Sequence, residues 1–431
     1  MKQALTKIIF CVAGMAKPLL VKIVPLPLLW KLRNKITARG FRRLQAAVRP
    51  YEAGHYEKGV NLIGNIRLEA GLGQSCRLVA SALEQTGIPM SVYQYTPSGA
   101  DDTGDHTWDE RISVQLPYDI NLIHINPLEL GTAYCRIDKS AWDYRYNIAF
   151  WLWELEEFPD EWTLYFQGLD EIWAPSAFTC EAIRRKTSLP VKCMPYYLEA
   201  PVQHACTRQD FGLPEGKFLF LMMYDSRSGM ERKNPQAALL AFQKAFDQTD
   251  DTVGMVIKIN GAAKKDEKRI RHIMNGYTNI YLIHDRLERN AVNSLMQCVD
   301  VVVSLHRAEG FGLVLAEAML LGTPVIATNW SANTEFMDQE TACMVDYQIV
   351  TLEKELPPFH AGCRWADPDI EQAAGFMRKL MEDKTFYEDL AVRAKMHVEE
   401  ILSMKRASGR MKDRLEEIYR ELEIDDCHLL P

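Results

Sequence analysis

DVVVSLHRAEGFGLVLAEAMLLGTPVIAT, residues 300–328, holds the most informative pattern in this chain. The β-branched run Val301–Val303 predicts a buried strand of a parallel sheet, because such strands are apolar on both faces. A loop follows, and then a helix that opens at Gly310 and ends at Gly322. The second apolar run, Val325–Ala327, predicts the next strand. The stretch therefore predicts a strand–loop–helix–strand unit of an α/β fold.

The start of this helix is suited to an anion, and two glutamates frame it. Backbone N–H groups at Gly310, Phe311 and Gly312 are free to bind an anion, and the helix dipole adds to the attraction. Glu309 precedes them, and Glu317 lies about 12 Å further along the helix axis. That exceeds the roughly 5–10 Å between the carboxyl groups of a glycoside hydrolase. It suits a long ligand held at two places with phosphate between. Two solvated carboxylates are the alternative, which the apolar neighbours of Glu317 disfavour.

In the context HRAEGFGLVLAEAM and GTPVIAT, these glutamates resemble the signature of glycosyltransferase family 4. Members of that family are retaining, nucleotide-sugar-dependent enzymes with the GT-B fold. The resemblance covers roughly residues 59–423 and is strongest over residues 224–328. It implies that Glu309 contacts hydroxyls of the donor sugar and that Glu317 binds the donor ribose.

A basic loop earlier in the chain supplies the cations that a diphosphate needs. Arg227 and Lys233 lie just before a helix that begins at Pro235. Cations are unfavourable beside a helix N-terminus unless an anion lies between them and the helix. The family has an arginine and a lysine at this spacing on the donor diphosphate, which the resemblance carries over to Arg227 and Lys233. Arg232 lies in the same loop, so the choice of arginine stays open, and a solvated basic loop is the alternative.

Composition limits the class of protein. The chain has 431 residues, of which 47% are hydrophobic, so it is long enough for two domains with large cores. Its net charge of −8 argues against nucleic acid as a partner. The ten cysteines form no C-x-x-C pair and no cluster with histidine. Zinc and disulfide frameworks are therefore unsupported, and a cytoplasmic location is expected.

The N-terminal extension, residues 1–57, is basic and apolar. Residues 1–50 contain eleven Lys and Arg and no acidic residue. Prolines and lysines interrupt the apolar runs, so none reaches the roughly 18–20 residues that span a bilayer. We expect an amphipathic segment in peripheral contact with the anionic inner face of the plasma membrane. A basic helix packed on the enzyme and a signal peptide are the alternatives.

Two features of the first domain also point to the donor. Gly71 and Gly73 lie in a predicted loop before a helix over Ser75–Gln85, where glycines let a phosphate approach the backbone. By resemblance this loop faces the donor phosphates, and a simple turn is the alternative. His124 lies near the end of a predicted strand, where the family commonly places a histidine near the donor sugar and its leaving phosphate. A hydrogen-bonded core histidine is the equal alternative.

The acceptor is the least legible part of the site. Glu154 and Glu156 follow a predicted strand that is rich in tryptophan, so their carboxylates are candidates for acceptor hydroxyls. Core aromatics with a solvated acidic loop are the alternative. Residues 58–200 are expected to form the acceptor-side domain and residues 201–400 the domain that binds the nucleotide sugar. Residues 401–431 are expected to form a helix that braces both domains.

A possible metal motif, Asp367-Pro368-Asp369, has a structural explanation. D-x-D binds metal in other glycosyltransferases, but here Asp367 fits a helix N-cap and Pro368 the first helical position. No metal and no cofactor is therefore expected. Charge on the departing diphosphate would be balanced by the basic loop and by the helix start.

The sequence thus predicts an α/β protein with two doubly wound, Rossmann-like domains facing across a cleft. By resemblance it is a retaining hexosyltransferase with a nucleotide-sugar donor, GDP-mannose first and UDP-hexoses next. The acceptor is a saccharide, expected to be lipid-linked, in the biosynthesis of a surface polysaccharide. The alternatives are another GT-B enzyme, such as a sugar-nucleotide epimerase or a phosphorylase, and a non-catalytic scaffold that binds a sugar nucleotide.

Overall fold

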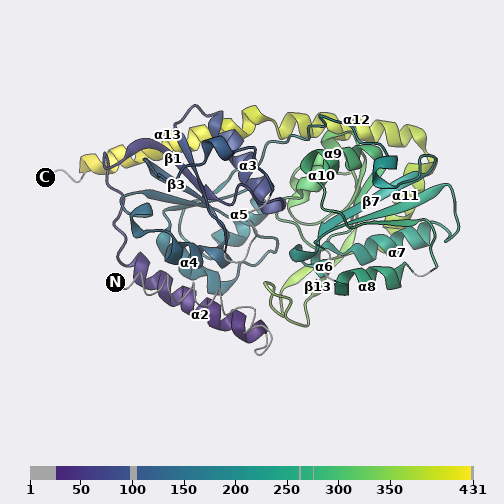
Figure 1. The fold of residues 1–431 in the computed structure, drawn as a ribbon, viewed down its shortest axis with the longest axis horizontal. Helices are drawn as coiled ribbons and strands as arrows, with labels where there is room; N and C mark the ends of the chain where they lie inside the picture. The colour runs from purple at the N-terminus through teal and green to yellow at the C-terminus, as the bar shows by residue number, and fades with distance from the viewer. Residues whose placement is uncertain (1–25, 98–103, 262–263, 275, 429–431) are drawn as a thin grey trace.

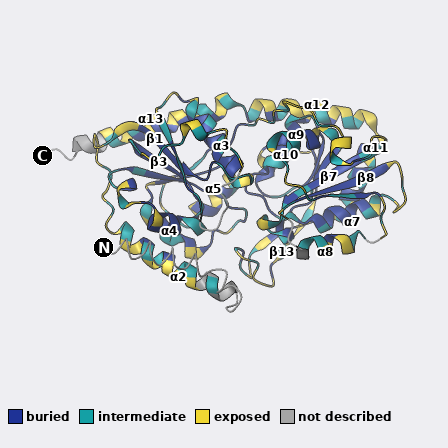
Figure 2. Cartoon of the chain, viewed as in Figure 1, coloured by how far each residue is buried: buried dark blue, intermediate teal, exposed yellow. Residues whose placement is uncertain are grey.

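The structure, a computed structural model, describes residues 26–97, 104–261, 264–274 and 276–428. Two α/β domains lie side by side, each built around a parallel sheet of six strands (Figure 1). This confirms the predicted fold class. The strands are dark blue in Figure 2, whereas the outer faces of the helices carry most of the exposed residues.

The first sheet has the strand order β2-β1-β3-β4-β5-β6. Its strands are β1 (Glu57–Gly64), β2 (Met90–Gln94), β3 (Tyr118–His124), β4 (Tyr146–Phe150), β5 (Glu171–Ala174) and β6 (Val191–Cys193). The helices of this domain are α3 (Gly71–Glu84), α4 (Pro127–Arg136) and α5 (Ala177–Arg184), with the 3-10 segments η1 (Asp109–Arg111), η2 (Lys139–Ala141) and η3 (Asp160–Gly168). The order reverses between β1 and β3, and open α/β sheets bind ligands beyond the carboxyl ends of strands at such a point.

The second sheet has the order β12-β11-β10-β7-β8-β9. Its strands are β7 (Phe218–Asp225), β8 (Val253–Asn260), β9 (Ile280–Ile283), β10 (Val301–Ser304), β11 (Val325–Thr328) and β12 (Cys343–Val345). The helical segments are η4 (Gln209–Phe211), η5 (Ser226–Ser228), α6 (Met230–Lys233), α7 (Pro235–Ala245), α8 (Lys264–Ile273), α9 (Arg289–Cys298), α10 (Leu313–Leu320) and η6 (Ala332–Glu335). The order reverses between β7 and β10, which brings the basic loop beside the loop that carries Glu309.

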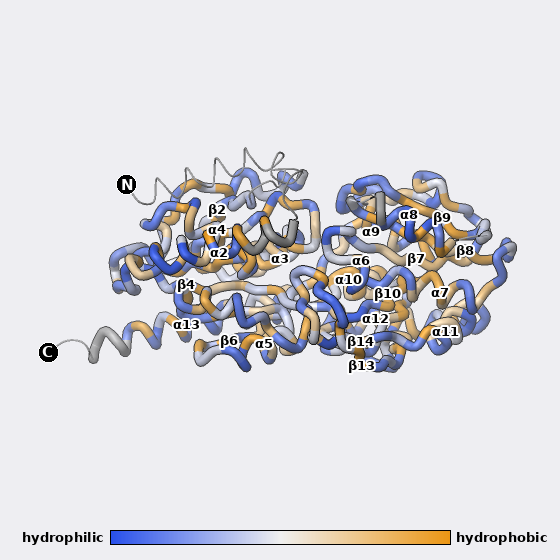
Figure 3. The backbone as a smooth tube through the Cα atoms, turned by 90° about the horizontal axis from the view of Figure 1, so that it is seen from below, coloured by the Kyte–Doolittle hydropathy of each residue, from blue (hydrophilic) through white to orange (hydrophobic). Residues whose placement is uncertain are grey.

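The strand β10 shows why this sequence forms a central strand. Val301, Val302 and Val303 are each at most 1% exposed, and Val302 pairs with Val325 of β11 in parallel register. Apolar side chains cover both faces of the sheet, as is typical of parallel strands between helices. In Figure 3 the tube is apolar along β10, whereas the outer helix α8 is hydrophilic.

The last three elements are the helices α11 (Ile370–Glu382), α12 (Lys384–Ile401) and α13 (Met404–His428). The helix α12 packs on α10 of the second domain, and α13 continues along the same side to pack on α3 of the first (Figure 1). The chain returns from the second domain to the first between α12 and α13. At this point the backbone N–H of Leu198 donates to the carbonyl of Leu402 at 2.9 Å. Arg414 of α13 forms a buried ion pair with Glu171 of β5.

The helix α2 (Leu26–Gln45) lies on the first domain, where it packs against α4. Phe41 is fully buried between Tyr134 and Tyr165, and Arg33 pairs with Glu129. This part of the extension therefore matches the alternative of a basic helix packed on the enzyme. Residues 1–25, which include most of the segment expected at the membrane, lie outside the described residues. No helix in the described part is long and apolar enough to cross a membrane.

Two local predictions were wrong. The helix α3 begins at Gly71 and not at Ser75, so both glycines lie in its first turn. A Cβ atom at Gly73 would lie 1.8 Å from the carbonyl oxygen of Leu68, whereas one at Gly71 would meet nothing within 4 Å. Gly73 is therefore required for close packing against the preceding loop, and Gly71 leaves the backbone open.

The second error concerns Asp367 and Pro368, which end a strand and do not open a helix. The strand β14 (Arg364–Pro368) pairs antiparallel with β13 (Tyr347–Thr351). The N-cap of α11 is Asp369, whose carboxylate accepts a hydrogen bond from the backbone N–H of Gln372 at 3.0 Å. Pairing with β13 places the segment in an extended conformation that its capping residues alone do not reveal.

Candidate active site

A cavity of about 800 Å³ lies between the domains. It is lined by the loops after β7 and β10 of the second domain and by the start of α3 and the segment after β4 of the first. The residues of the sequence prediction that line it are Gly71, Glu154, Arg227, Lys233, Glu309, Gly310, Phe311 and Gly312. The cavity thus occupies the reversal point of the second sheet, where ligands of α/β domains bind.

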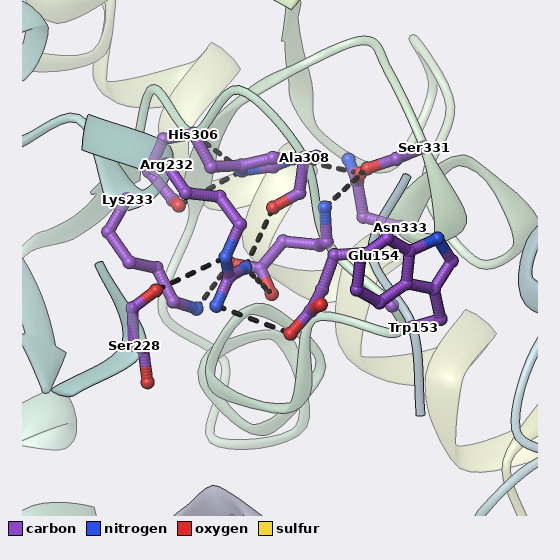
Figure 4. Close-up of polar contacts among 12 residues, drawn as sticks. Trp153, Glu154, Ser228, Arg232, Lys233, His306, Ala308, Ser331 and Asn333 are labelled. Atoms are coloured by element: carbon purple, nitrogen blue, oxygen red, sulfur yellow. Dashed lines mark hydrogen bonds and ion pairs between the residues drawn. The ribbon is translucent and has the colours of Figure 1, made fainter. Parts of the chain in front are cut away.

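Glu309 is the centre of the charged part of this cavity. Its side chain is 9% exposed, and its carboxylate forms ion pairs with Lys233 and, at 3.3 Å, with Arg232. Arg232 and Lys233 both belong to the short helix α6, and Figure 4 shows their side chains side by side. Burial alone would raise the pKa of Glu309, but the positive charges of Lys233 and Arg232 outweigh it and lower that pKa to about 2. Glu309 is therefore an ionised hydrogen-bond acceptor and not a proton donor.

The depressed pKa of Glu309 predicts a specific loss of stability in acid. A group whose pKa is lower in the folded state stabilises the fold above its unfolded pKa and loses that contribution as the pH falls towards the folded value. Between pH 6 and pH 3, wild type should lose about 2 kcal/mol of unfolding free energy relative to Glu309→Gln, which cannot titrate. Urea unfolding of both proteins across this range measures the difference. A difference that does not change with pH would contradict an ionised, paired Glu309.

The structure gives Arg227 and Arg232 different roles, whereas the sequence left open which of them contacts the diphosphate. Arg232 is 4% exposed, donates to the carbonyl of Ala308 at 2.9 Å, and forms an ion pair at 3.5 Å with Glu154 of the first domain (Figure 4). Arg227 lines the rim of the cavity, with a side chain that is 61% exposed and paired with Asp225 at 2.7 Å. Arg232 thus holds the Glu309 loop against the first domain, whereas Arg227 faces solvent.

The loop after β11 holds the backbone of Glu309, which the sequence did not indicate. The N–H of Glu309 donates to the hydroxyl of Ser331 at 2.8 Å, and its carbonyl accepts from the N–H of Ala332 at 3.2 Å. Ser331 has a φ of +76°, which few residues other than glycine adopt. Fully buried His306 contacts Asn333 of the same loop at 3.0 Å. No local pattern identifies these residues, because their contacts join segments about 25 residues apart.

The helix start after Glu309 is closely packed against the first domain. The carbonyl of Gly310 accepts from the hydroxyl of Ser176 at 2.7 Å, and a Cβ atom at this glycine would lie 2.7 Å from the carbonyl oxygen of Trp153. Gly312 has a φ of +97° and precedes the first residue of α10. Phe311 packs edge-on against Tyr196. Glycine is therefore needed at both positions, once for close approach and once for backbone conformation.

Glu317 does not line this cavity and is buried inside α10. It is 1% exposed and forms an ion pair with Arg289 at the start of α9. Burial raises the pKa of Glu317, and the charge of Arg289 opposes that rise. One carboxylate oxygen has no hydrogen-bond partner among the described residues. This oxygen is therefore an acceptor that no described residue uses.

Like Gly73 and Glu317, the sequence candidates His124 and Glu156 do not line the cavity. His124 is 2% exposed, contacts the hydroxyl of Ser75 at 2.7 Å and stacks on Phe150. Its burial lowers its pKa to about 4, so it is neutral at physiological pH. This placement matches the alternative of a core histidine. Glu156 forms an ion pair with Arg364 of β14 at 3.0 Å.

Part of the second domain matches a known protein family. Residues 221–353, which span β7 to β13 and contain Arg227, Lys233, Glu309 and Glu317, match the family described as Glycosyl transferases group 1. No curated protein sequence matches the chain.

Solved structures show the same fold at low sequence identity. HepE of Anabaena, in complex with UDP and glucose, has a TM-score of 0.59 and 13% identity, covering 84% of this chain and 100% of its own. A glycosyltransferase from Rickettsia africae has a TM-score of 0.61 and 12% identity, covering 84% and 99%. Sucrose-phosphate synthase of Thermosynechococcus elongatus has a TM-score of 0.61 and 14% identity, covering 86% and 100%.

The chain thus shares its fold with these solved structures. The segment that matches the group 1 glycosyltransferase family, residues 221–353, lies within the second domain.

Proposed function

We propose that this protein transfers a hexose from a nucleoside diphosphate sugar to a saccharide acceptor with retention of anomeric configuration. The observation that carries the proposal is the ionised carboxylate of Glu309, held between Arg232 and Lys233 in a cavity that both domains line. A carboxylate there accepts hydrogen bonds from sugar hydroxyls, while Lys233 beside it and Arg227 nearby face the diphosphate. These are the two needs of a nucleotide-sugar donor.

The chemical role of each group follows from where charge develops. Departure of the diphosphate leaves negative charge, which preorganised positive groups stabilise in a site shielded from water. Arg227, Lys233 and the N–H groups at Gly310–Gly312 supply that stabilisation without a metal ion. Glu309 orients the sugar, and Glu317 holds the ribose. In this scheme the departing phosphate itself takes the proton of the acceptor hydroxyl, and His124 has no direct role.

The donor and the setting are part of the same proposal. HepE was crystallised with UDP and with UDP-glucose, which favours a UDP-hexose beside the GDP-mannose that the sequence resemblance suggests. The basic, apolar sequence that precedes α2 supports a cytoplasmic enzyme at the inner face of the plasma membrane, acting on a lipid-linked saccharide of a surface polysaccharide.

A thermal-shift panel tests the donor site. GDP-mannose, UDP-glucose, UDP-galactose and UDP-N-acetylglucosamine are compared on wild type, Glu317→Ala and Glu156→Gln in the presence of a chelator. One nucleotide sugar should raise the melting temperature of wild type and of Glu156→Gln, because a ligand that binds the native state stabilises it. It should not raise that of Glu317→Ala, which lacks the ribose acceptor. No shift with any of the four would overturn the donor assignment.

Product analysis then separates transfer from other GT-B chemistry. Incubation with the donor that binds and a saccharide acceptor should yield a glycoside and a nucleoside diphosphate, and the new bond should keep the anomeric configuration of the donor. An epimerized sugar without a glycoside would show an epimerase, and consumption of inorganic phosphate would show a phosphorylase. Binding without turnover would favour a scaffold.

A further inference from the structure

The hairpin β13–β14 extends from the second domain to the first. Its tip, residues 352–363, bears His360, which pairs with Glu161 at 2.6 Å, and Phe359, whose ring lies 5.5 Å from that of Trp153. Just beyond the tip, Arg364 pairs with Glu156. The hairpin tip therefore rests on the segment that follows β4, the same segment that carries Glu154.

The tip gives the cavity an apolar side. Leu356, Pro357, Pro358 and Phe359 line the cavity, and so do Leu128 and Leu152 of the first domain. Among these side chains, those of Leu128, Leu152 and Leu356 are partly exposed. Apolar side chains that line a cavity without being covered are stabilised when a ligand removes them from water, by roughly 25 cal/mol per Å² of apolar surface.

The donor does not account for this apolar surface. Phosphates and sugar hydroxyls match the charged groups around Lys233 and Glu309, and the nucleoside is expected beside Glu317, beyond α10. The apolar lining is contributed by the hairpin tip and by the first domain, next to Glu154. The first domain is the acceptor side of the cavity, so the apolar surface is available to the acceptor.

Resting on the proposed function, we infer that the hairpin tip and Leu128 bind an alkyl chain attached to the acceptor sugar. The accepting hydroxyl then lies near Glu154, and the chain runs between Leu356 and Leu128. A second cavity, of about 520 Å³, also has Leu128 in its lining and lies beside α2, between Asn34, Arg42 and Trp162. That cavity is also lined by Asp160, Glu161 and Gln167, so the alkyl chain is placed in the first cavity, between Leu356 and Leu128.

Isothermal titration with octyl β-glucoside, kept below its micelle concentration, tests the subsite, and methyl β-glucoside is the matched polar probe. Octyl glucoside should bind wild type at least about 10-fold more tightly than methyl glucoside, because burial of about two CH₂ groups suffices for that factor. Leu356→Asn and Leu128→Asn should each abolish the preference. Ile349→Asn changes an exposed residue on the same hairpin, 40% exposed and outside the cavity, and should keep it.

The outcomes distinguish this subsite from the donor site. Octyl binding that is equal in wild type, Leu356→Asn and Leu128→Asn, or that is no tighter than methyl binding, would overturn the subsite. The titrations contain no nucleotide, and the melting-temperature shift with UDP is measured separately on each variant. If UDP does not raise the melting temperature of wild type, the result counts against the proposed function. If UDP raises the melting temperature of Leu356→Asn, that variant is folded.

Discussion

Glu309→Gln should lower kcat/KM for sugar transfer by about 10²- to 10³-fold, the size typical of removing one preorganised polar group from an active site. The amide keeps the shape of the side chain but cannot accept two charge-assisted hydrogen bonds from donor hydroxyls. It also leaves Lys233 and Arg232 without their shared counter-ion. Initial rates with the donor that stabilises wild type, measured over a range of acceptor concentrations, give the ratio.

The control for this experiment is Glu156→Gln, because Glu156 lies on the same segment as Glu154 but outside the cavity lining. It should retain activity within about threefold of wild type, since a partly exposed ion pair contributes little. UDP should still raise the melting temperature of Glu309→Gln, because Arg227 and Lys233, the two cations proposed to bind the diphosphate, remain. Activity of Glu309→Gln equal to that of the control would remove Glu309 from the mechanism.

The second large effect is expected on stability, from Glu171→Ala. Glu171 is fully buried in β5, and Arg414 of α13 binds both its oxygens, with one contact at 2.9 Å. Glu171→Ala leaves the buried Arg414 only the half-exposed carboxylates of Glu417 and Glu421. Breaking a buried ion pair costs up to about 3–5 kcal/mol. Urea unfolding followed by tryptophan fluorescence should show a loss of this order, because Trp173 also donates to Glu171, at 2.7 Å.

The matched control is Glu423→Ala, which removes an ion pair of the same helix with Lys58. Both of those side chains are about two-thirds exposed, so little change is expected. Limited proteolysis should in addition cut α13 of Glu171→Ala faster than α13 of the control. A variant of Glu171 as stable as the control would show that α13 is held by apolar packing alone.

The sequence predicted those parts of the fold that repeat a local pattern. Apolar runs such as Val301–Val303 lie within the observed strands, because burial on both faces of a parallel sheet requires a continuous apolar segment. The six-residue spacing of Arg227 and Lys233 indicated the basic loop. Glu309 was predicted as a site residue from the glycine-marked loop–helix junction and the family resemblance, and the structure places it in the cavity lining.

The parts that the sequence did not reveal depend on contacts between distant segments. Arg232 resembles any loop arginine until the fold places it beside Ala308 and Glu154. Ser331 binds the backbone of Glu309 only because β11 returns next to β10. The sequence did not predict the hairpin β13–β14, because its two partly exposed strands lack a continuous apolar run.

The hydrogen bond between Leu198 and Leu402 joins the two points at which the chain passes from one domain to the other. A relative motion that preserves it has a single pivot, so the domains can rotate there but cannot slide past each other. Displacement grows with distance from a pivot, and Figure 1 places β13 on the side of the molecule opposite α12 and α13. Rotation about this pivot would move the hairpin tip most, against only the ion pairs of His360 and Arg364 with the first domain, so we expect a bulky substrate to enter on the hairpin side.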